Sequence, residues 1–336
     1  MNSRVKIIAE IGVNHNGSMS IAKKLIRQLS KLDIDFIKFQ IADPNSVYSK
    51  DAFKAEYQKL YDKEKKIIEM SRKLQLTKKQ HLELSNYCKK HRKKYACTAF
   101  DLKNLKFLIK KIKIPFIKIP SGEILSYDIL KFVSKQSKKI ILSTGMASFE
   151  EIEKAIKILN SNKKKNLTIL HCTSTYPAKE NYINLNVIDT LRKKFNLPVG
   201  YSDHSISDDV LIGAIAKGAK IVEKHVTLSN SLKGPDHKSS ITIAKFKKLV
   251  KKIRNFEIIL GSYKKKISKE ENKIKLMARK SIVAKKFIRA KKKITLQDIC
   301  FKRPGTGISP INFRKVVGKI SKRDIAKDRV IRKNFI

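Results

Sequence analysis

Two histidines in the second half of the sequence follow short apolar runs, and each has an acidic residue close by. His204 follows Asp203 in GYSDHS, and His225 stands two positions after Glu223 in EKHVT. Neutral imidazoles bind divalent cations, and nearby carboxylates can orient the rings or join the coordination shell. On adjacent strands the two histidines would lie roughly 5 Å apart. They could then share Mn²⁺, Mg²⁺ or Zn²⁺ and leave positions open for substrate; the alternative is a pair of structural core histidines.

Two lysines lie inside other apolar runs, Lys38 in DFIKFQ and Lys118 in FIKIPS. Many lysines of so basic a chain have no chemical role, but an ammonium group among apolar side chains is costly unless an anion meets it. Two such cations, with serine, threonine and backbone donors, are suited to a phosphate or a carboxylate. Beside a metal, they predict a small anionic substrate.

These residues require a scaffold that brings several strand ends together. Short β-branched runs alternate with amphipathic segments, which is typical of βα units and a parallel sheet. Eight such units predict an α/β fold, a (β/α)8 TIM barrel over residues 1–261. An open doubly wound sheet is the alternative, but it usually has fewer strands and a GxGxxG turn, which GVNHNG does not match. The expected strands are 5–11, 35–40, 94–100, 116–121, 139–144, 167–173, 198–203 and 220–226.

In such barrels the catalytic groups lie at the carboxyl ends of the strands. A polar residue at one strand end alone could be a helix cap or a solvated tip. The gathering of many polar residues on one rim of the barrel, however, predicts an active site. The residues at these ends are Glu10, Lys38, Gln40, Thr98, Lys118, Ser121, Ser143, Thr144, Ser174, Tyr176, Ser202, Asp203, His204, Glu223 and His225.

The last quarter of the sequence has a different character. A charged stretch at 262–279 predicts a linker, and a small β-rich domain is expected over 280–336. Within it, AKKKITLQDI (290–299) and AKDRVIRKNF (326–335) form a weak internal repeat. The segment KRPGTGISP between them predicts a turn-rich loop.

The composition limits the other classes of protein. The chain has 77 Lys+Arg against 29 Asp+Glu, a formal net charge of +48. The lysines are spread over nearly every expected helix, which argues against a specific nucleic-acid partner. The four cysteines form no CxxC pair, so neither a zinc site nor a disulfide framework is expected. With no signal-peptide pattern and no apolar run of roughly 20 residues, we expect a cytoplasmic protein without a membrane span.

Several motifs, taken in order, resemble those of the sialic acid synthase family. They are AEIGVNHNGS, FIKFQ, IKIPSGEI, ILSTGM, LHCTSTYP, GYSDHS, EKHVTL and GPDHKSS, and KRPGTGISP resembles a loop of the family's C-terminal antifreeze-like (β-clip, SAF) domain. The resemblance covers nearly the whole chain. It implies a transferase that condenses phosphoenolpyruvate with an N-acetylated hexosamine, giving a nonulosonic acid and phosphate. It also implies Mn²⁺ or Mg²⁺ and a domain-swapped homodimer.

The resemblance also assigns roles to residues. It makes His204 and His225 the metal ligands and counts them as catalytic together with Glu10, Lys38 and Lys118. Arg303 would reach the N-acetyl group from the partner chain, and Arg279 receives no role. Phosphoenolpyruvate would be held by Lys38, Thr98, Lys118, Ser121, Ser143 and Ser202; Glu10, Gln40, Tyr176 and Asp236 would face the sugar; and Ser174, where relatives often have Asn, would also bind substrate.

The implied reaction has two parts. The metal polarises the aldehyde of the open-chain sugar while C3 of phosphoenolpyruvate attacks it, and water then adds at C2 as phosphate leaves by C–O cleavage. Within the family that the chain resembles, we expect an N-acetylneuraminate synthase acting on N-acetylmannosamine, in carbohydrate and cell-surface polysaccharide biosynthesis. The alternative is a legionaminate synthase acting on a 2,4-diacetamido-6-deoxyhexose, and a pseudaminate synthase fits the motifs less well. The alternative of another class is a basic nucleic-acid-binding protein with an inactive barrel.

Overall fold

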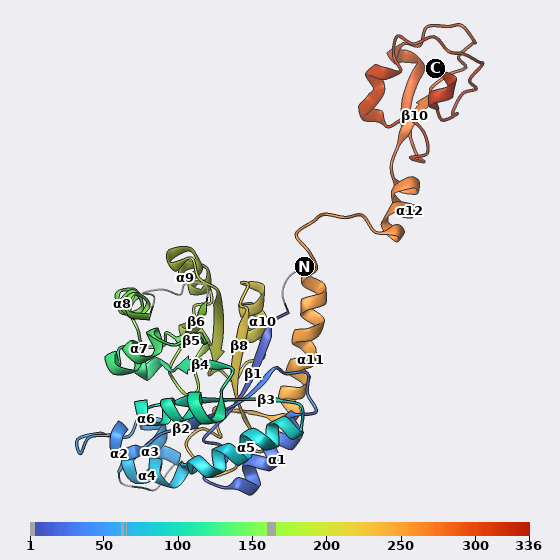
Figure 1. Cartoon of the computed structure of the whole chain (residues 1–336). Helices are drawn as coiled ribbons and strands as arrows, with labels where there is room; N and C mark the ends of the chain where they lie inside the picture. The colour runs from blue at the N-terminus through green and yellow to red at the C-terminus, as the bar shows by residue number, and fades with distance from the viewer. Residues whose placement is uncertain (1–3, 62–63, 65, 160–165) are drawn as a thin grey trace. The chain divides into compact units, whose positions relative to one another are not determined.

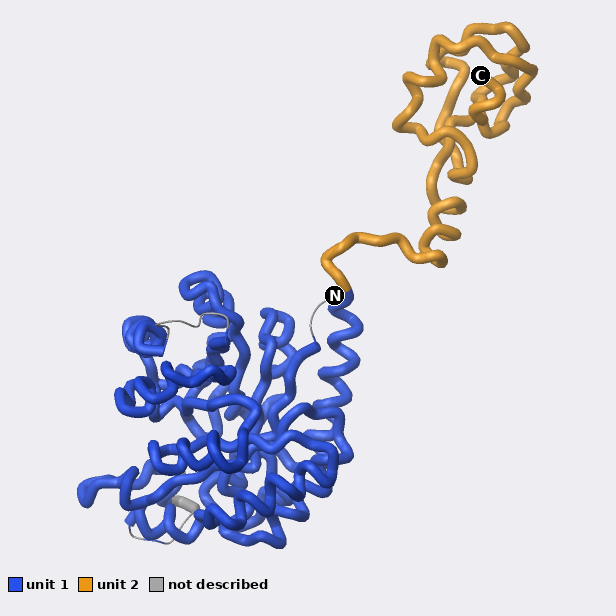
Figure 2. Tube along the Cα trace, in the orientation of Figure 1, with its two compact units in different colours: residues 1–261 blue, residues 262–336 orange. Residues whose placement is uncertain are grey.

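The computed structural model describes residues 4–61, 64, 66–159 and 166–336. The chain divides into two units, Met1–Gly261 and Ser262–Ile336 (Figure 2). Each unit has its own hydrophobic core.

The first unit is a closed barrel of eight parallel strands (Figure 1). Closure follows from the pairing of β1 with both β2 and β8. The predicted (β/α)8 TIM barrel, followed by a small separate C-terminal unit, is confirmed. The strands are β1 Lys6–Gly12, β2 Phe36–Ile41, β3 Lys94–Ala99, β4 Phe116–Ile119, β5 Lys139–Ser143, β6 Leu167–Cys172, β7 Val199–Asp203 and β8 Ile221–Thr227, and a short β9, Ile241–Thr242, pairs with β8.

Helices surround the barrel and bury one apolar stripe each. In α1 the buried residues Ala22, Leu25, Ile26 and Leu29 recur at helical spacing, so they form the face that packs on the sheet. Helix α5 starts with a capping box at Thr77. The outer helices are α1 Met19–Leu29, α5 Lys78–Lys90, α6 Leu102–Phe107, α7 Tyr127–Ser134, α8 Phe149–Leu159, α9 Val187–Phe195, α10 Asp209–Ala216 and α11 Ile243–Leu260.

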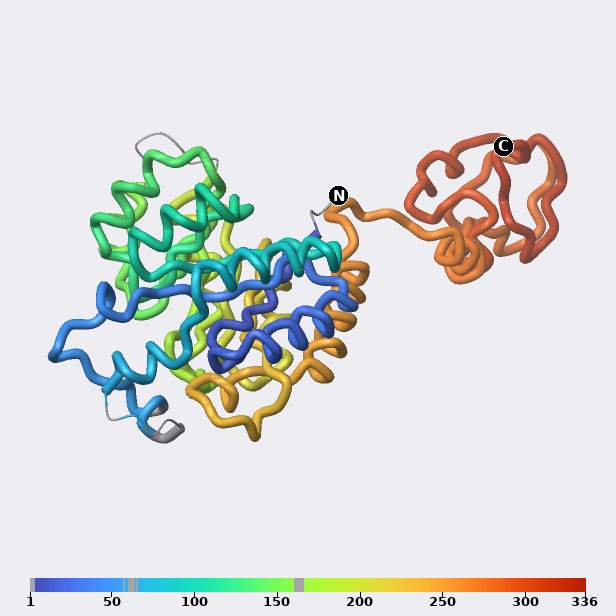
Figure 3. Tube along the Cα trace, turned by 60° about the horizontal axis from the view of Figure 1, so that its bottom comes forward, coloured from blue at the N-terminus to red at the C-terminus, as the bar shows by residue number. Residues whose placement is uncertain are grey.

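Strand β2 is followed by an insert before α5. The insert contains α2 Pro44–Val47, α3 Glu56–Tyr61 and α4 Ile67–Leu74. Figure 3 shows it in light blue, projecting at one side of the barrel. Because the insert begins at the carboxyl end of β2, it can form a wall beside the barrel mouth.

An apolar layer fills the barrel beneath its polar end. It consists of Ile8, Ala96, Phe116, Ile141 and Leu170, with Phe36 and Ile221 packed against it. Side chains two positions apart in a strand point to the same face. The inward positions that follow on these strands are, in the same order, Glu10, Thr98, Lys118, Ser143, Cys172, Lys38 and Glu223. A layer of polar residues therefore rests on an apolar floor.

The second unit contains a helix and a small sheet. Helix α12, Lys269–Ala278, begins with a capping box at Ser268 and lies within the segment predicted as a linker. Strands β10 (Ser281–Ala284) and β11 (Ile299–Lys302) pair antiparallel. The core of this unit consists of Ile282, Ala284, Ile288, Ile294, Ile299, Val316, Ile325 and Ile331.

The internal repeat of this unit is shifted by one residue from the predicted alignment. Lys291 and Asp328 occupy equivalent turns and both have a positive φ, 63° and 65°. Ile294 and Ile331 follow three positions later, and both are fully buried. The alignment of the two repeat segments by sequence instead paired Ile294 with Val330. The turn and the buried isoleucine set the true register, and the shared Ala-Lys pair does not.

Asp298 gives a stability prediction for this unit. Its buried carboxylate accepts from the Thr295 backbone N–H (2.9 Å) and hydroxyl (2.8 Å), and from Lys292 Nζ (2.8 Å). Asp298→Asn should lower the free energy of unfolding by about 2 kcal/mol, because a buried charged hydrogen-bond network is broken. Calorimetry of the full chain would measure the loss. Asp328→Asn is the control, since it breaks only an exposed pair with Lys302.

The same site predicts an acid dependence. Burial alone would raise the pKa of Asp298, but hydrogen bonds from Lys292 and Thr295 outweigh burial and lower it. Because the pKa is lower in the folded state, the ionised Asp298 stabilises the unit above the ordinary aspartate pKa of about 3.9. This stabilisation is lost as the pH falls below that value. In Asp298→Asn this acid loss should be smaller; an equally steep loss would contradict the role of Asp298.

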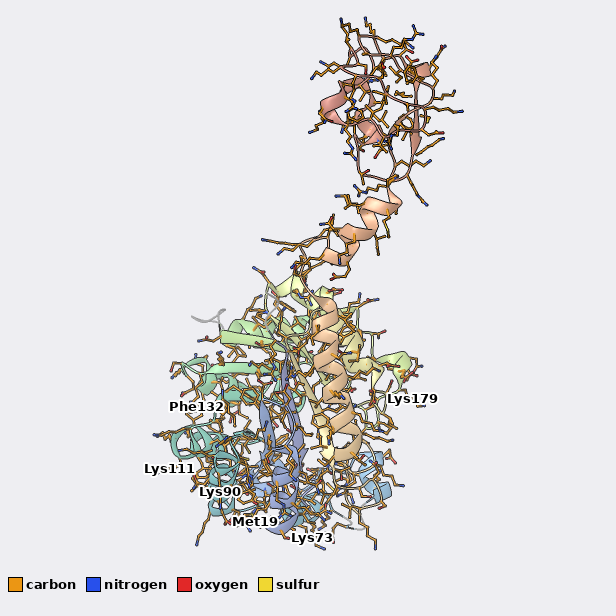
Figure 4. The ribbon with its side chains drawn as sticks, turned by 90° about the vertical axis from the view of Figure 1, so that its right-hand side faces the viewer. Met19, Lys73, Lys90, Lys111, Phe132 and Lys179 are labelled. Atoms are coloured by element: carbon orange, nitrogen blue, oxygen red, sulfur yellow. The ribbon has the colours of Figure 1, made fainter. Side chains whose placement is uncertain are left out.

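The surface lysines are dispersed over the first unit. Figure 4 labels Lys73, Lys90 and Lys111, which belong to three different helices, and Lys179, which lies in a loop. Within the described ranges, no helix is both long and apolar enough to cross a membrane.

Candidate active site

Four charged residues form a cluster in the polar layer of the barrel: Glu10, Lys38, Lys118 and Glu223. Lys38 Nζ lies 2.5 Å from Glu10 Oε2 and 3.7 Å from Glu223 Oε2. Lys118 Nζ lies 3.1 Å from Glu223 Oε1. All four side chains are nearly or fully buried. The anions that meet the two lysines are thus carboxylates of the chain itself, which the sequence did not assign.

Hydroxyl groups complete this charged cluster. Thr98 Oγ1 accepts a hydrogen bond from Lys38 Nζ at 2.9 Å. Ser202 Oγ donates to Glu223 Oε1 at 3.2 Å. The predicted phosphoenolpyruvate residues Lys38, Thr98, Lys118 and Ser202 therefore gather at one place.

The two carboxylates of the charged cluster differ in protonation. Burial raises the pKa of Glu10 to about 7, although Lys38 opposes the shift. Burial would also raise the pKa of Glu223, but the charges of Lys118 and Lys38 outweigh it and lower the pKa to about 2. Glu10 can therefore gain or lose a proton near neutral pH, as a general acid–base group must. With Glu10 protonated, two ammonium groups face one carboxylate, which favours a bound anion.

His204 and His225 lie side by side, with ring centroids 5.6 Å apart. His204 Nδ1 is 2.7 Å from the Thr173 carbonyl, so Nδ1 carries the proton and Nε2 has the lone pair. The Tyr176 hydroxyl lies 3.0 Å from that Nε2. Burial lowers the pKa of both rings, and His204 lowers that of His225 further. Both imidazoles are therefore neutral, the form that binds a metal.

The histidine pair meets the chemical needs of a divalent cation. His225 Nδ1 is buried and has no hydrogen-bond partner among the described residues. It lies 3.8 Å from Asp236 Oδ2. Among the described residues, no three His, Cys, Asp or Glu side chains lie close enough together to hold a metal, and the histidine pair is no exception. Two histidines alone would leave coordination positions for water and substrate, as in a catalytic site.

The other predicted phosphoenolpyruvate residues line the neighbouring strand ends. Ser121 Oγ accepts from the Gly145 N–H at 3.0 Å and contacts Cys172 Sγ at 3.2 Å. Ser143 Oγ is buried and has no hydrogen-bond partner within the described residues. A Cβ atom on Gly145 would lie only 2.1 Å from Ser174 Oγ, so a larger residue there would have to displace this hydroxyl.

The predicted sugar residues largely share one cavity of about 240 Å³. Gln40, Tyr176 and Asp236 line it together with His225. Glu10 does not line it, but Gln40 Nε2 donates to Glu10 Oε1 at 3.2 Å and so connects the cavity to the charged cluster. The cavity extends from His225 to the insert after β2.

Two predicted residues lie elsewhere. Ser174 lines a neighbouring cavity of about 600 Å³ beside β5 and β6. Arg303 belongs to the second unit, where its Nε donates to the Ala278 carbonyl at 2.8 Å. Its role toward a partner chain stays a prediction.

Sequence reasoning missed the central position of Glu223 and misplaced Asp203. Glu223 and His225 are two positions apart on β8, so they share the inward face, a signal that the sequence already contained. Asp203 pairs with Lys224 on the outer face and does not join the histidines. The cavity wall from Val47, Met70 and Leu74 had no sequence signal, because it depends on where the insert folds.

The comparisons with known proteins agree with this geometry. The NeuB family model matches residues 25–265, and the SAF domain model matches residues 279–336. An N,N'-diacetyllegionaminic acid synthase of Campylobacter jejuni is 41% identical over 97% of this chain and 98% of its own length. An N,N'-diacetyllegionaminic acid synthase of Legionella pneumophila is 38% identical over 93% of this chain and 89% of its own length.

A solved structure shares the architecture. The N-acetylneuraminic acid (sialic acid) synthetase of Leptospira borgpetersenii, in complex with citrate, aligns with a TM-score of 0.73 and 33% identity, over 81% of this chain and 90% of its own. The prediction of an enzyme of the sialic acid synthase type is thereby confirmed. The chain therefore belongs to the NeuB family, and it carries a SAF domain at residues 279–336.

Proposed function

We propose that the chain condenses phosphoenolpyruvate with a 2,4-diacetamido-6-deoxyhexose, forming a legionaminic-type nonulosonic acid and phosphate. The proposal replaces the initial preference for N-acetylmannosamine with its alternative. The similarity to two legionaminic acid synthases supports it. The observation that carries it is the chemistry of the cavity beside His225.

Away from His225 and Asp236, the wall of this cavity carries apolar and uncharged polar side chains and no charged one among the described residues. An extended sugar with its aldehyde at His225 and Asp236 would place its other end against this wall. A methyl group at C6 suits apolar side chains, whereas a hydroxyl would lose hydrogen bonds to water. The apolar lining consists of Val13, Ile41, Ala42, Val47, Met70, Leu74, Phe100 and Pro235.

The cavity also disfavours a phosphorylated acceptor. Among its described lining residues there is no lysine or arginine, although the chain contains 77 of them. A phosphate group would be left without a cation, which is costly in a partly buried site. Uncharged polar groups from Gln58, Ser71 and Tyr48 could instead meet a second acetamido group.

The charged cluster would hold phosphoenolpyruvate. Lys38 and Lys118 would bind its carboxylate and phosphate, and their fixed positions stabilise charge as the reaction proceeds. C3 of phosphoenolpyruvate forms a bond to the aldehyde carbon, whose oxygen takes a proton. A water oxygen then bonds to C2, and the bond from C2 to the bridging oxygen breaks, so that phosphate leaves.

Glu10 lies where the two substrates would meet. Its Oε2 contacts Lys38 and its Oε1 accepts from Gln40, which lines the sugar cavity. With a pKa of about 7, Glu10 can move the proton that water gives up toward the oxygen that needs one. Mn²⁺ or Mg²⁺, held by His204 and His225, would supply a Lewis acid for the aldehyde oxygen.

An acceptor panel tests this proposal. The value of kcat/KM should be highest for the 2,4-diacetamido-6-deoxyhexose, about 10-fold or more lower for N-acetylmannosamine, and lowest for its 6-phosphate, since one apolar group is worth about 10- to 200-fold. Val47→Thr keeps the side-chain shape but adds a hydroxyl. It should therefore reduce, a few-fold, the ratio of kcat/KM for the 2,4-diacetamido-6-deoxyhexose to kcat/KM for N-acetylmannosamine. Phe53→Leu, at an exposed site outside the cavity lining, is the control. A preference for the 6-phosphate would contradict the proposal.

A homodimer with exchanged C-terminal units is proposed for the assembly. The exposed apolar side chains of Ile258, Ile259 and Tyr263, next to the boundary between the units, support it, because such groups are commonly covered in an assembly. Arg303→Ala and His225→Ala chains should each be inactive alone. Mixed and allowed to exchange, they should regain activity, because one site per heterodimer keeps both residues. Exchange shown by mass spectrometry without recovered activity would oppose the proposal.

A further inference from the structure

A buried ion pair lies on the outer face of the barrel wall, behind the two histidines. Lys224 Nζ is 2.5 Å from Asp203 Oδ2, and the two side chains are 3% and 0% exposed. Asp203 and Lys224 are partners in the pairing of β7 with β8. Each immediately precedes one of the histidines, His204 or His225. Because side chains alternate along a strand, the ion pair and the histidines belong to opposite faces of the same wall.

The same two side chains hold the loop that follows β7. Asp203 Oδ1 accepts from the Ser205 N–H at 2.9 Å. Lys224 Nζ donates to the Ser205 carbonyl at 2.8 Å. Both backbone groups of Ser205 are therefore bound. His204 lies between Asp203 and Ser205, so its backbone is fixed on both sides, while its ring is held by the Thr173 carbonyl.

We propose that Asp203 and Lys224 are positioning residues that fix His204 relative to His225, so that both rings can bind one divalent cation. The inference rests on the metal role proposed above. A buried ion pair adds little net stability, because removing both charges from water costs about as much as their attraction returns. Its contribution here is geometric: one lysine ties β8, just before His225, to the residues on either side of His204. Mutation of residues that orient metal ligands in this way commonly lowers metal affinity or activity about 10- to 100-fold.

The test measures Mn²⁺ binding to the full chain without substrates, by electron paramagnetic resonance of free Mn²⁺. The variants are Asp203→Asn, Lys224→Met and the double variant, which removes both charges and leaves neither unpaired. Each should bind Mn²⁺ about 10-fold or more weakly. For the double variant, excess Mn²⁺ should restore part of kcat, a recovery that general misfolding would not show.

The matched control is Asp35→Asn, at the opposite end of the barrel. Asp35 pairs with Lys6 at 3.0 Å and with Arg254 at 3.4 Å. This variant should lower the melting temperature but leave the affinity for Mn²⁺ unchanged. Wild-type Mn²⁺ affinity in the folded double variant would overturn the positioning role. A wild-type chain that binds no Mn²⁺ would contradict the metal site itself; equal kcat/KM in the wild-type chain and the double variant would then also reject the positioning role.

Discussion

Lys38→Met should lower kcat/KM for phosphoenolpyruvate by about 10³-fold. Loss of one preorganised charge at a reacting centre costs about 10²- to 10³-fold. The upper end is expected because Lys38 also pairs with both carboxylates of the charged cluster. Methionine keeps the length of the side chain but removes its charge. Glu10 and Glu223 then share Lys118 as their remaining partner in the charged cluster. The cluster would bind an anionic substrate poorly. Phosphate release at varied phosphoenolpyruvate concentration measures the effect.

The control for this variant is Lys90→Met, which changes an exposed lysine at the end of α5. It should keep wild-type activity, because the dispersed surface charge has no part in the reaction. Lys38→Met should also unfold at a lower temperature, since it leaves buried carboxylates less well compensated. Near-wild-type kcat/KM in folded Lys38→Met would show that phosphoenolpyruvate binds elsewhere.

Removal of divalent metal should abolish the acceptor-dependent release of phosphate, and Mn²⁺ should restore it. His225→Ala should resemble the metal-free enzyme, with a loss of about 10³-fold or more, because Lewis-acid activation is worth several kcal/mol. The reason is that His225 offers a buried Nδ1 without a hydrogen-bond partner in the described chain, next to Asp236. Activity assays with chelated and reloaded protein measure the effect.

His91→Ala is the matched control for the metal experiment. His91 caps the end of α5, and its ring packs on Tyr87, away from the barrel mouth. This variant should need and respond to Mn²⁺ as the wild-type chain does. Full activity after chelation, with metal removal verified by elemental analysis, would refute the assignment of His204 and His225.

The barrel and most of its mouth could be predicted because they depend on local patterns. Each strand is a short β-branched run, and its inward face follows from the period of two. The positions of Lys38, Lys118, His204 and His225 on one rim follow directly from that rule. The same rule places Glu223 inside, two positions from His225, and Asp203 outside, one position from His204.

Other features of the site depend on tertiary packing and left no local signal. The insert with Val47 and Met70 forms a wall of the sugar cavity only because of where it folds. The pKa of Glu10 depends on its complete burial beside Lys38, which no sequence pattern shows. The proposed acceptor depends on this cavity, which the sequence motifs do not describe.

The central claim is that one site joins the two substrates and cleaves the C–O bond of phosphoenolpyruvate. Mass spectrometry of both products, starting from phosphoenolpyruvate with ¹⁸O at the bridging position and the 2,4-diacetamido-6-deoxyhexose, tests it most directly. We predict a nonulosonic acid without the label and phosphate that carries it, both formed only when the sugar is present. Label retained in the carbon product, or phosphate released without the sugar, would contradict the account.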